Sequence, residues 1–505
     1  SAGGSTSNHY YTGAVNLTAD SFINLRDSNS ATVSTASTNI ILNGAVTGTG
    51  KVTLDSSNGL SGGNQLNGVL YLQADNSGWS GGFDITRGTI QVQHLDGFGT
   101  GDVTASAGLI QFNMPANNIV NLAQNFTVDA PGGILELSVD AGGTLSGDLA
   151  INLNGVITLG SNANANNALR ITQSSDNFSI LNIPNSVVLG NDASISYQGN
   201  AVRSFEITGV ISETGGSRSL AINDELYAWG VTSRTVRLSG NNTFSGDLSL
   251  TEGALEFSTV SNIGGAASNL GKGSGITLAG GTFSFVGDMI SQSTNRPINQ
   301  TGAATFAANG TNGATITYSG PVSSAGNSIT LTGTGEGTFS GAVVQTGTSA
   351  DVNLNSGIWH FSGVGSTIAD DVFVNATSTG TAVLELDTTG TLSWTAGTSN
   401  GLYIRNGGVV NLNADDVNGV ANSGNMSYIL LGFDTTGDPG TLNTNTFKIE
   451  TPRLDLGSAV PNRAGIIVGT GTVTSNYAGT DYAQGFRVYD GKISANLTGK
   501  VTILK

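Results

Sequence analysis

Two acidic turns hold the residues of this 505-residue chain best suited to binding a metal ion. They read NADDVNG, from Asn413 to Gly419, and FDTTGDPG, from Phe433 to Gly440. Carboxylate oxygens on turns are ligands that Ca²⁺ prefers. The candidate calcium ligands are Asp415, Asp416, Asp434 and Asp438. NADDVNG lacks the first acidic ligand of an EF-hand loop and its twelfth-position glutamate, so ordinary turn chemistry stays open as the alternative.

The histidines give no sign of a catalytic centre. His9, His94 and His360 are far apart in the sequence, and the outward position of His360 in GIWHF predicts a solvated side chain. Nucleophile-elbow, Walker and HExxH patterns are absent. The glycine-rich turn GTGEG, Gly333 to Gly337, has no helix after it that would direct amides at an anion. We therefore expect no catalytic residue and no organic cofactor.

Two further side-chain types could act on sugars. A polysaccharide lyase or hydrolase needs carboxylates, or arginine with carboxylates, on one face. The acids beside the repeats described below, where a turn or an outward side chain is expected, are Asp84, Asp148 and Asp247. Tryptophans could stack on sugars. Trp359 and Trp394 take inward positions, however, and Trp79 takes the place of Phe244 in the related repeat, so core packing is favoured for these three; Trp229 remains open.

Composition favours an extracellular β protein. Glycine accounts for 74 residues, roughly twice its ordinary share, and charged residues for only 10%, against about 25% in typical proteins. The net charge of −17 disfavours nucleic-acid binding. Cysteine is absent, which argues against disulfides and thiolate metal sites. No run approaches the 18 apolar residues of a membrane-spanning helix, so we expect no membrane span.

A short motif repeats along the chain: glycine, any residue, a bulky apolar residue, any residue, a bulky apolar residue. Its twelve copies begin at Gly50, Gly68, Gly88, Gly108, Gly133, Gly155, Gly253, Gly281, Gly357, Gly390, Gly408 and Gly499. From Gly50 to Gly155 the steps are 18, 20, 20, 25 and 22 residues. Such spacing predicts an all-β parallel β-helix, or β-solenoid, with about 18–25 residues per rung.

Each motif is expected to form one strand of a rung. Alternate apolar residues point inward, the residues between them face solvent, and glycine with positive φ makes the corner. We predict a repeat-built solenoid over residues 1–412. Residues 413–505 are expected to form a terminal solenoid region with longer loops, because three of the eight prolines lie there: Pro439, Pro452 and Pro461.

Two units carry a family resemblance. LSGNNTFSGDLSLTEGALEFS, from Leu238 to Ser258, and the segment from Asn76 to Phe112 resemble the autotransporter-associated β-strand repeat, also called the passenger-associated transport repeat. Both share an aromatic-Ser-Gly start, a central glycine and a Gly-x-Gly turn, at Gly99–Gly101 and Gly271–Gly273. Looser matches are Thr338 to Phe361 and Thr144 to Leu159.

The resemblance implies a right-handed parallel β-helix, secreted or at the surface of a Gram-negative-type bacterium. Functions in the family vary and include adhesion. The membrane barrel that ends the family's autotransporters is not recognisable before Lys505, which leaves cleavage, a longer chain and another export route open.

Both ends of the sequence keep a strand pattern. The last residues read GKVTILK, and residues 1–25 contain strand-like pieces rather than a capping helix. We predict that the ends pair with other copies of the chain, giving a fibre or surface array. The alternative is that a longer protein was cut. The favoured function is that of a non-enzymatic extracellular structural protein; an adhesin that binds extracellular polysaccharide or a host surface is second, and a polysaccharide-acting enzyme third.

Overall fold

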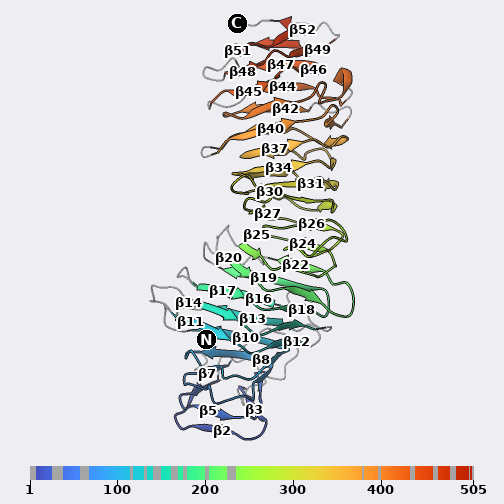
Figure 1. Cartoon of the computed structure of the whole chain (residues 1–505). Coiled ribbons are helices and arrows are strands. Elements are labelled where there is room, and N and C mark those ends of the chain that lie inside the picture. Colours follow the sequence, from blue (N-terminus) through green and yellow to red (C-terminus); the bar gives the residue numbers. More distant parts are fainter. Residues whose placement is uncertain are drawn as a thin grey trace. The chain divides into compact units, whose positions relative to one another are not determined.

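The computed structural model describes residues 7–25, 38–56, 68–113, 118–129, 134–139, 149–160, 169–173, 179–199, 204–223, 235–377, 380–395, 400–422, 424–432, 438–458, 464–477, 485–499 and 501–502. Within these residues the chain is nearly all strand, and its one helical element is the 3-10 turn η1 (Val420–Asn422). The strand pairings between rungs are parallel. The fold is therefore the predicted parallel β-solenoid (Figure 1). Two compact units divide it: residues 1–254 with 267–271, and residues 255–266 with 272–505.

The first unit has three strand-built faces. The first face contains β1 (Ser7–Tyr11), β4 (Thr38–Leu42), β7 (Val69–Leu72), the second half of β8 (Phe83–Val92), β10 (Ala107–Phe112), β13 (Ile134–Val139), β16 (Leu169–Gln173), β19 (Ala193–Gly199), β22 (Leu220–Asn223) and β24 (Leu248–Leu250). The second contains β3 (Ser21–Asn24), β6 (Val52–Asp55), the first half of β8, β9 (Val103–Ala105), β12 (Phe126–Val128), β15 (Ile157–Leu159), β18 (Val187–Leu189) and β21 (Ile211–Glu213). The third contains β2 (Val15–Leu17) and β5 (Val46–Gly48), and further along β11 (Asn118–Leu122), β14 (Leu149–Leu153), β17 (Ser179–Ile183), β20 (Ser204–Ile207) and β23 (Thr235–Leu238).

The second unit also has three strand-built faces, which are numbered here independently of those of the first unit. Its first face contains β25 (Ala254–Phe257), β27 (Thr282–Phe285), β30 (Ala304–Ala308), β33 (Ile329–Gly333), β36 (Val352–Leu354), β39 (Val372–Asn375), β42 (Gly401–Arg405), β44 (Tyr428–Leu431), β47 (Arg453–Leu456), β50 (Gly485–Val488) and β53 (Val501–Thr502). The second contains β28 (Gln292–Thr294), β31 (Thr315–Tyr318), β34 (Glu336–Phe339), β37 (Gly357–Phe361), β40 (Ala382–Leu386), β43 (Val409–Leu412), β45 (Gly440–Asn443), β48 (Gly465–Val468) and β51 (Gly491–Ile493). The third contains β26 (Ile276–Leu278), β29 (Ile298–Gln300), β32 (Val322–Ala325), β35 (Val343–Thr346), β38 (Ser366–Ile368) and β41 (Leu392–Trp394), and further along β46 (Lys448–Thr451), β49 (Thr472–Ser475) and β52 (Asn496–Gly499).

The core follows the predicted alternation. In β7 the inward Leu70 and Leu72 are buried, whereas Tyr71 between them is only half-buried. Eleven of the twelve motif copies bury both apolar residues in this way; the side chains after Gly499 lie outside the described residues. Alternation puts one set of side chains into the narrow interior, where rungs above and below exclude water. Three tryptophans belong to this core, as predicted: Trp79, Trp359 and Trp394.

Glycine is required at the corners for two different physical reasons, whereas the sequence predicts only one, a positive φ. Gly357 has the expected positive φ, +84°. The other described motif glycines with positive φ are Gly88, Gly253, Gly281, Gly390 and Gly499. No positive φ occurs at Gly50, Gly68, Gly108, Gly155 or Gly408, and Gly133 lies outside the described residues. At Gly155 a Cβ atom would lie 1.8 Å from the carbonyl oxygen of Gln124, so close approach to the preceding rung excludes a side chain there.

Rung length varies more than the glycine spacing suggests. Gln91 and Gln111 occupy equivalent positions and are 20 residues apart, as predicted. Asn8 and Asn39 are 31 apart, however, and Glu136 and Arg170 are 34 apart. The step from Gly50 to Gly68 is not a rung at all, because β6 and β7 lie on different faces. Rungs also continue past residue 412, since β42 pairs with β44 and β43 with β45.

Candidate functional sites

Two of the predicted calcium ligands surround a lysine. The Asp415 carboxylate accepts a hydrogen bond from the backbone amide of Lys448, at 2.7 Å. The Lys448 ammonium lies 2.5 Å from Glu450 Oε1 and 3.8 Å from Asp416 Oδ1. Burial raises the pKa of the Asp416 carboxyl, and Lys448 opposes that rise. The lysine charge therefore stands where a bound cation would neutralise these carboxylates.

The other two predicted ligands do not join them. Asp438 precedes β45, and its backbone oxygen accepts a hydrogen bond from Gly407. It lies at the opposite end of the paired β43 and β45 from Asp415, which follows β43. Asp434 falls outside the described residues. Among the residues the structure describes, no three histidine, aspartate or glutamate side chains are grouped to hold a metal ion. Calcium binding stays a prediction.

His360 is not the freely solvated side chain that its outward position predicts. It lies on β37, with Nδ1 2.9 Å from Asp387 Oδ2 and Nε2 3.3 Å from Glu336 Oε1. Its side chain is 23% exposed. The carboxylates come from the neighbouring strand β34 and from the end of β40, so the histidine connects three rungs. Both ring nitrogens face carboxylates, an arrangement that supports rung stacking.

The two described carboxylates beside the repeats, Asp84 and Asp247, belong to no group that could hold a metal ion. Asp84 is a half-buried outward residue of β8 and is aligned with Thr104. Asp247 is exposed, and its backbone oxygen accepts the amide of Leu220. Asp148 is not among the described residues.

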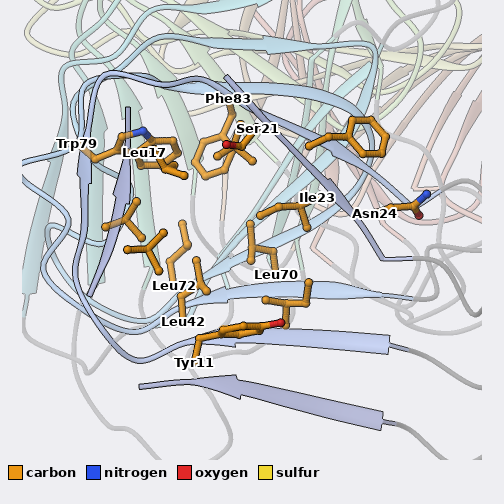
Figure 2. Close-up of a pocket in the computed structure, with 15 residues that line it drawn as sticks. Tyr11, Leu17, Ser21, Ile23, Asn24, Leu42, Leu70, Leu72, Trp79 and Phe83 are labelled. Atoms are coloured by element: carbon orange, nitrogen blue, oxygen red, sulfur yellow. The ribbon is translucent and has the colours of Figure 1, made fainter. Parts of the chain in front are cut away.

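The first rung of the first unit has an open apolar end. A cavity of about 320 Å³ lies there, lined by residues of β1, β2 and β3 and of the two rungs that follow (Figure 2). Tyr11 is 52% exposed, although its partner two rungs on, Leu72, is buried. Val15, Leu17 and Ile23 are likewise only half-buried. Among the described residues, the inward face of this rung therefore lacks the covering neighbour that the later rungs possess.

The last rung of the second unit shows the same incomplete covering. Strands β51 and β52 pair with β48 and β49, and no further strand pairs with them among the described residues. Ile493 is aligned with the fully buried Ile467, yet it is 36% exposed. Leu497, aligned with the fully buried Val473, is half-buried.

One outer face of the second unit carries large and charged side chains. We call it the arginine–aromatic face and define it by the outward residues of β39, β42, β44, β47 and β50. They are Phe373, Asn375, Tyr403, Arg405, Tyr428, Leu430, Arg453, Asp455 and Arg487. Three arginines and one aspartate give this face a net charge of +2 (3 − 1), in a chain whose net charge is −17.

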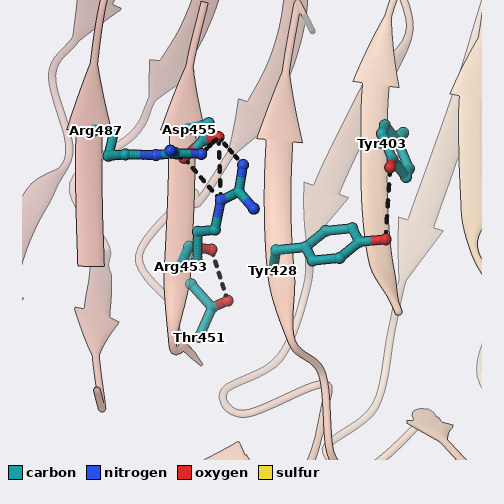
Figure 3. A network of polar contacts seen from close by, with 6 residues as sticks. All are labelled: Tyr403, Tyr428, Thr451, Arg453, Asp455 and Arg487. Carbon is teal, nitrogen blue, oxygen red and sulfur yellow. Dashed lines mark hydrogen bonds and ion pairs between the residues drawn. The ribbon is translucent and has the colours of Figure 1, made fainter. Parts of the chain in front are cut away.

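Two of its arginines hold one buried carboxylate (Figure 3). Asp455 is fully buried and accepts hydrogen bonds from Arg453, on its own strand, and from Arg487, on the next rung. Arg487 Nε lies 2.7 Å from Asp455 Oδ1, and its Nη2 also contacts the carboxylate. Hydrogen bonding to Asp455 raises the pKa of the Arg487 guanidinium. The Arg487 fork fixes β50 against β47, whereas Arg453 supports the carboxylate from within its own strand.

Two tyrosines extend the polar contacts toward β39. Tyr428 donates a hydrogen bond to Asp371 Oδ1 at 2.8 Å, and its oxygen lies 3.5 Å from that of Tyr403. Burial raises the pKa of the Asp371 carboxyl, and the neighbouring Asp370 and Asp351 raise it further. Burial also raises the pKa of Tyr428. The Tyr428 hydroxyl therefore stays protonated and can donate at neutral pH.

The sequence offered little sign of this face. Its members belong to segments 25 to 32 residues apart, and only the register of stacked rungs aligns them. A usable signal existed in FVNA and LYIRN, where bulky or charged residues take outward positions that elsewhere hold Ser, Thr or Asn. No family model, no curated protein and no solved structure matches the chain. The resemblance to the autotransporter repeat therefore remains a prediction.

Proposed function

We propose that this protein is an extracellular structural protein of a bacterial surface that associates with further copies through its first and last rungs. The observation that carries the proposal is the open apolar end of the first rung. Tyr11, Val15 and Ile23 occupy inward positions there, and none of the strands that the structure describes covers them. Apolar surface of this kind gains free energy when a neighbour removes it from water.

A second copy is the occupant that best fits this end. The last rung presents Ile493 and Leu497 at inward positions, and its strands β51 and β52 have an unpaired edge among the described residues. Parallel rungs accept and offer the same backbone pattern, so the last rung of one copy can continue the ladder of another. Such head-to-tail contact is heterologous and produces a filament unless the ring closes.

Corner glycines supply a sharp test. A Cβ atom on Gly44 would lie 2.1 Å from the carbonyl oxygen of Gly13, which is the equivalent position in the preceding rung. Gly13 itself has no atom within 4 Å of the place where its Cβ would lie. A methyl group at Gly13 would therefore leave the monomer intact and project toward a rung stacked on this end.

The experiment compares assembly of purified variants across a wide concentration range, by sedimentation velocity and negative-stain electron microscopy. We expect filaments of uniform width for the parent, and weaker assembly for Gly13→Ala and Ile23→Lys. Val364→Lys is the matched control, because Val364 is 64% exposed in a turn away from the end rungs. A chain that stays monomeric, or variants that assemble like the parent, would overturn the proposal.

The amino-acid composition and the repeat resemblance support this function, although neither tests it. A chain that lacks cysteine and is poor in charge suits an exported β protein. The secreted or cell-surface location in a Gram-negative-type bacterium rests on the repeat resemblance. Among the described residues, no helix has the length and apolarity needed to cross a membrane. Adhesion is a second candidate function, favoured by the arginine–aromatic face.

A further inference from the structure

The positive charge of the arginine–aromatic face is concentrated on a chain that is otherwise acidic. Its outward residues sum to +2. At physiological salt, charges separated by more than about 8 Å are largely screened. A ligand at this face therefore responds mainly to the local arginines and to the two carboxylates on or beside the face, Asp455 and Asp371. The distant carboxylates that make the chain acidic have much less effect.

Of the three arginines on this face, Arg405 has the greatest capacity to bind a ligand, because Arg453 and Arg487 already hold Asp455. Its guanidinium carbon lies 4.7 Å from the centre of the Phe373 ring and 5.9 Å from that of Tyr403. No carboxylate pairs with it among the described residues, and its buried Nε has no hydrogen-bond partner there. The aromatic rings hold the guanidinium in place, which lowers the entropy that binding an anion would cost.

The surroundings of Arg405 combine apolar and hydrogen-bonding groups. Phe373 and Tyr403 stack with ring centres 4.7 Å apart and an angle of 21° between the rings. Tyr403 carries its hydroxyl at the border with Tyr428. Asn406 donates a hydrogen bond to the amide oxygen of Asn375, at the outward position aligned with Arg405. Aromatic carbon, hydroxyl and amide groups together suit the apolar and hydroxyl edges of a sugar ring.

We propose that the arginine–aromatic face binds a saccharide that carries carboxylate groups, a polymer of uronic acids, with Arg405 as the donor to the carboxylate. The planar guanidinium can donate two parallel hydrogen bonds to a carboxylate. Phe373 and Tyr403 contact the apolar part of the same or the adjacent sugar. This binding goes beyond self-association, and it gives the solenoid a means of attachment to an extracellular matrix.

The test measures binding of the whole chain to polygalacturonate and alginate, with a neutral glucan and single-stranded DNA as comparison polymers, at physiological salt. We expect binding to the two uronates only. Arg405→Ala is expected to weaken it about tenfold or more, because a hydrogen bond to a charged group contributes about 1.5–3 kcal/mol. Arg405→Lys keeps the charge but loses the planar fork, so it should restore only part of the binding.

Matched variants separate this site from general electrostatics and from assembly. Arg237 is also an outward arginine, but Glu206 lies beside it at 3.8 Å. Arg237→Ala should bind uronates like the parent, and Phe373→Ala should bind less. Arg405→Ala should form the same filaments as the parent. Equal binding of glucan or DNA, equal losses in the Arg405 and Arg237 variants, or no uronate binding would each overturn the proposal.

Discussion

Removing the charge of Asp455 should destabilise the end of the second unit strongly. Asp455 is fully buried and accepts hydrogen bonds from two arginines, whose side chains are only 24% and 15% exposed. Asp455→Asn would leave both guanidinium groups largely buried without a counter-charge. Breaking a buried pair in this way costs about 3–5 kcal/mol. We expect a loss of that size in the local free energy of opening.

A second variant separates charge from packing. Replacing all three side chains, as Arg453→Met, Asp455→Leu and Arg487→Met, removes the network together with the cost of burying its charges. Such replacements are often neutral or stabilising. The triple variant should therefore be more stable than Asp455→Asn, although it changes more atoms. The exposed pair Glu206 and Arg237 provides the control, and Glu206→Gln should cost about 1 kcal/mol or less.

Hydrogen exchange followed by mass spectrometry is the suitable assay, because a solenoid can open locally without unfolding as a whole. Peptides from β47 and β50 should exchange much faster in Asp455→Asn, while those from the first unit keep their protection. If Asp455→Asn exchanges like the parent, the buried charges are already neutralised by other means. If the triple variant is as unstable as Asp455→Asn, lost packing explains the effect, and the reasoning from charge is wrong.

Three further predictions test the fold. Burial raises the pKa of Asp371, so its contribution to stability is present below the unfolded pKa and is lost as pH rises through the folded pKa. Asp371→Asn should therefore be more stable than the parent at pH 7. The difference in unfolding free energy between the two, measured by urea unfolding, should narrow toward pH 4, and a difference that stays constant with pH would contradict this. Gly44→Ala should cost about 1–3 kcal/mol because its Cβ meets the Gly13 carbonyl oxygen at 2.1 Å, whereas Gly13→Ala should stay within about 0.5 kcal/mol; equal unfolding midpoints would refute the steric argument. Trp359→Ala should cost about 3–5 kcal/mol of unfolding free energy, because the side chain is fully buried and its ring centre lies 5.4 Å from that of Phe339. Urea unfolding followed by circular dichroism measures this loss, with Ile358→Ala at an exposed position of the same strand as the control. A loss no larger than that of Ile358→Ala would contradict the prediction.

The sequence alone determined the strand pattern and the composition of the core. Glycine followed by alternating apolar residues can bury one set of side chains only in a strand, since the side-chain period of a strand is two. Val52 and Leu54, for example, were identifiable as core residues from GKVTL. The placement of two tryptophans followed from the same alternation, as the burial of Trp359 and Trp394 confirms.

Which strands share a face was decided only by the tertiary structure. Gly50 and Gly68 begin identical motifs, yet β6 and β7 lie on different faces, because a local motif does not record how many residues pass between corners. The arginine–aromatic face has the same origin. Phe373, Tyr403, Asp455 and Arg487 are aligned by hydrogen bonds between rungs. Backbone pairing is almost independent of side-chain identity, so the contacts between distant outward residues emerge only when the rungs are stacked.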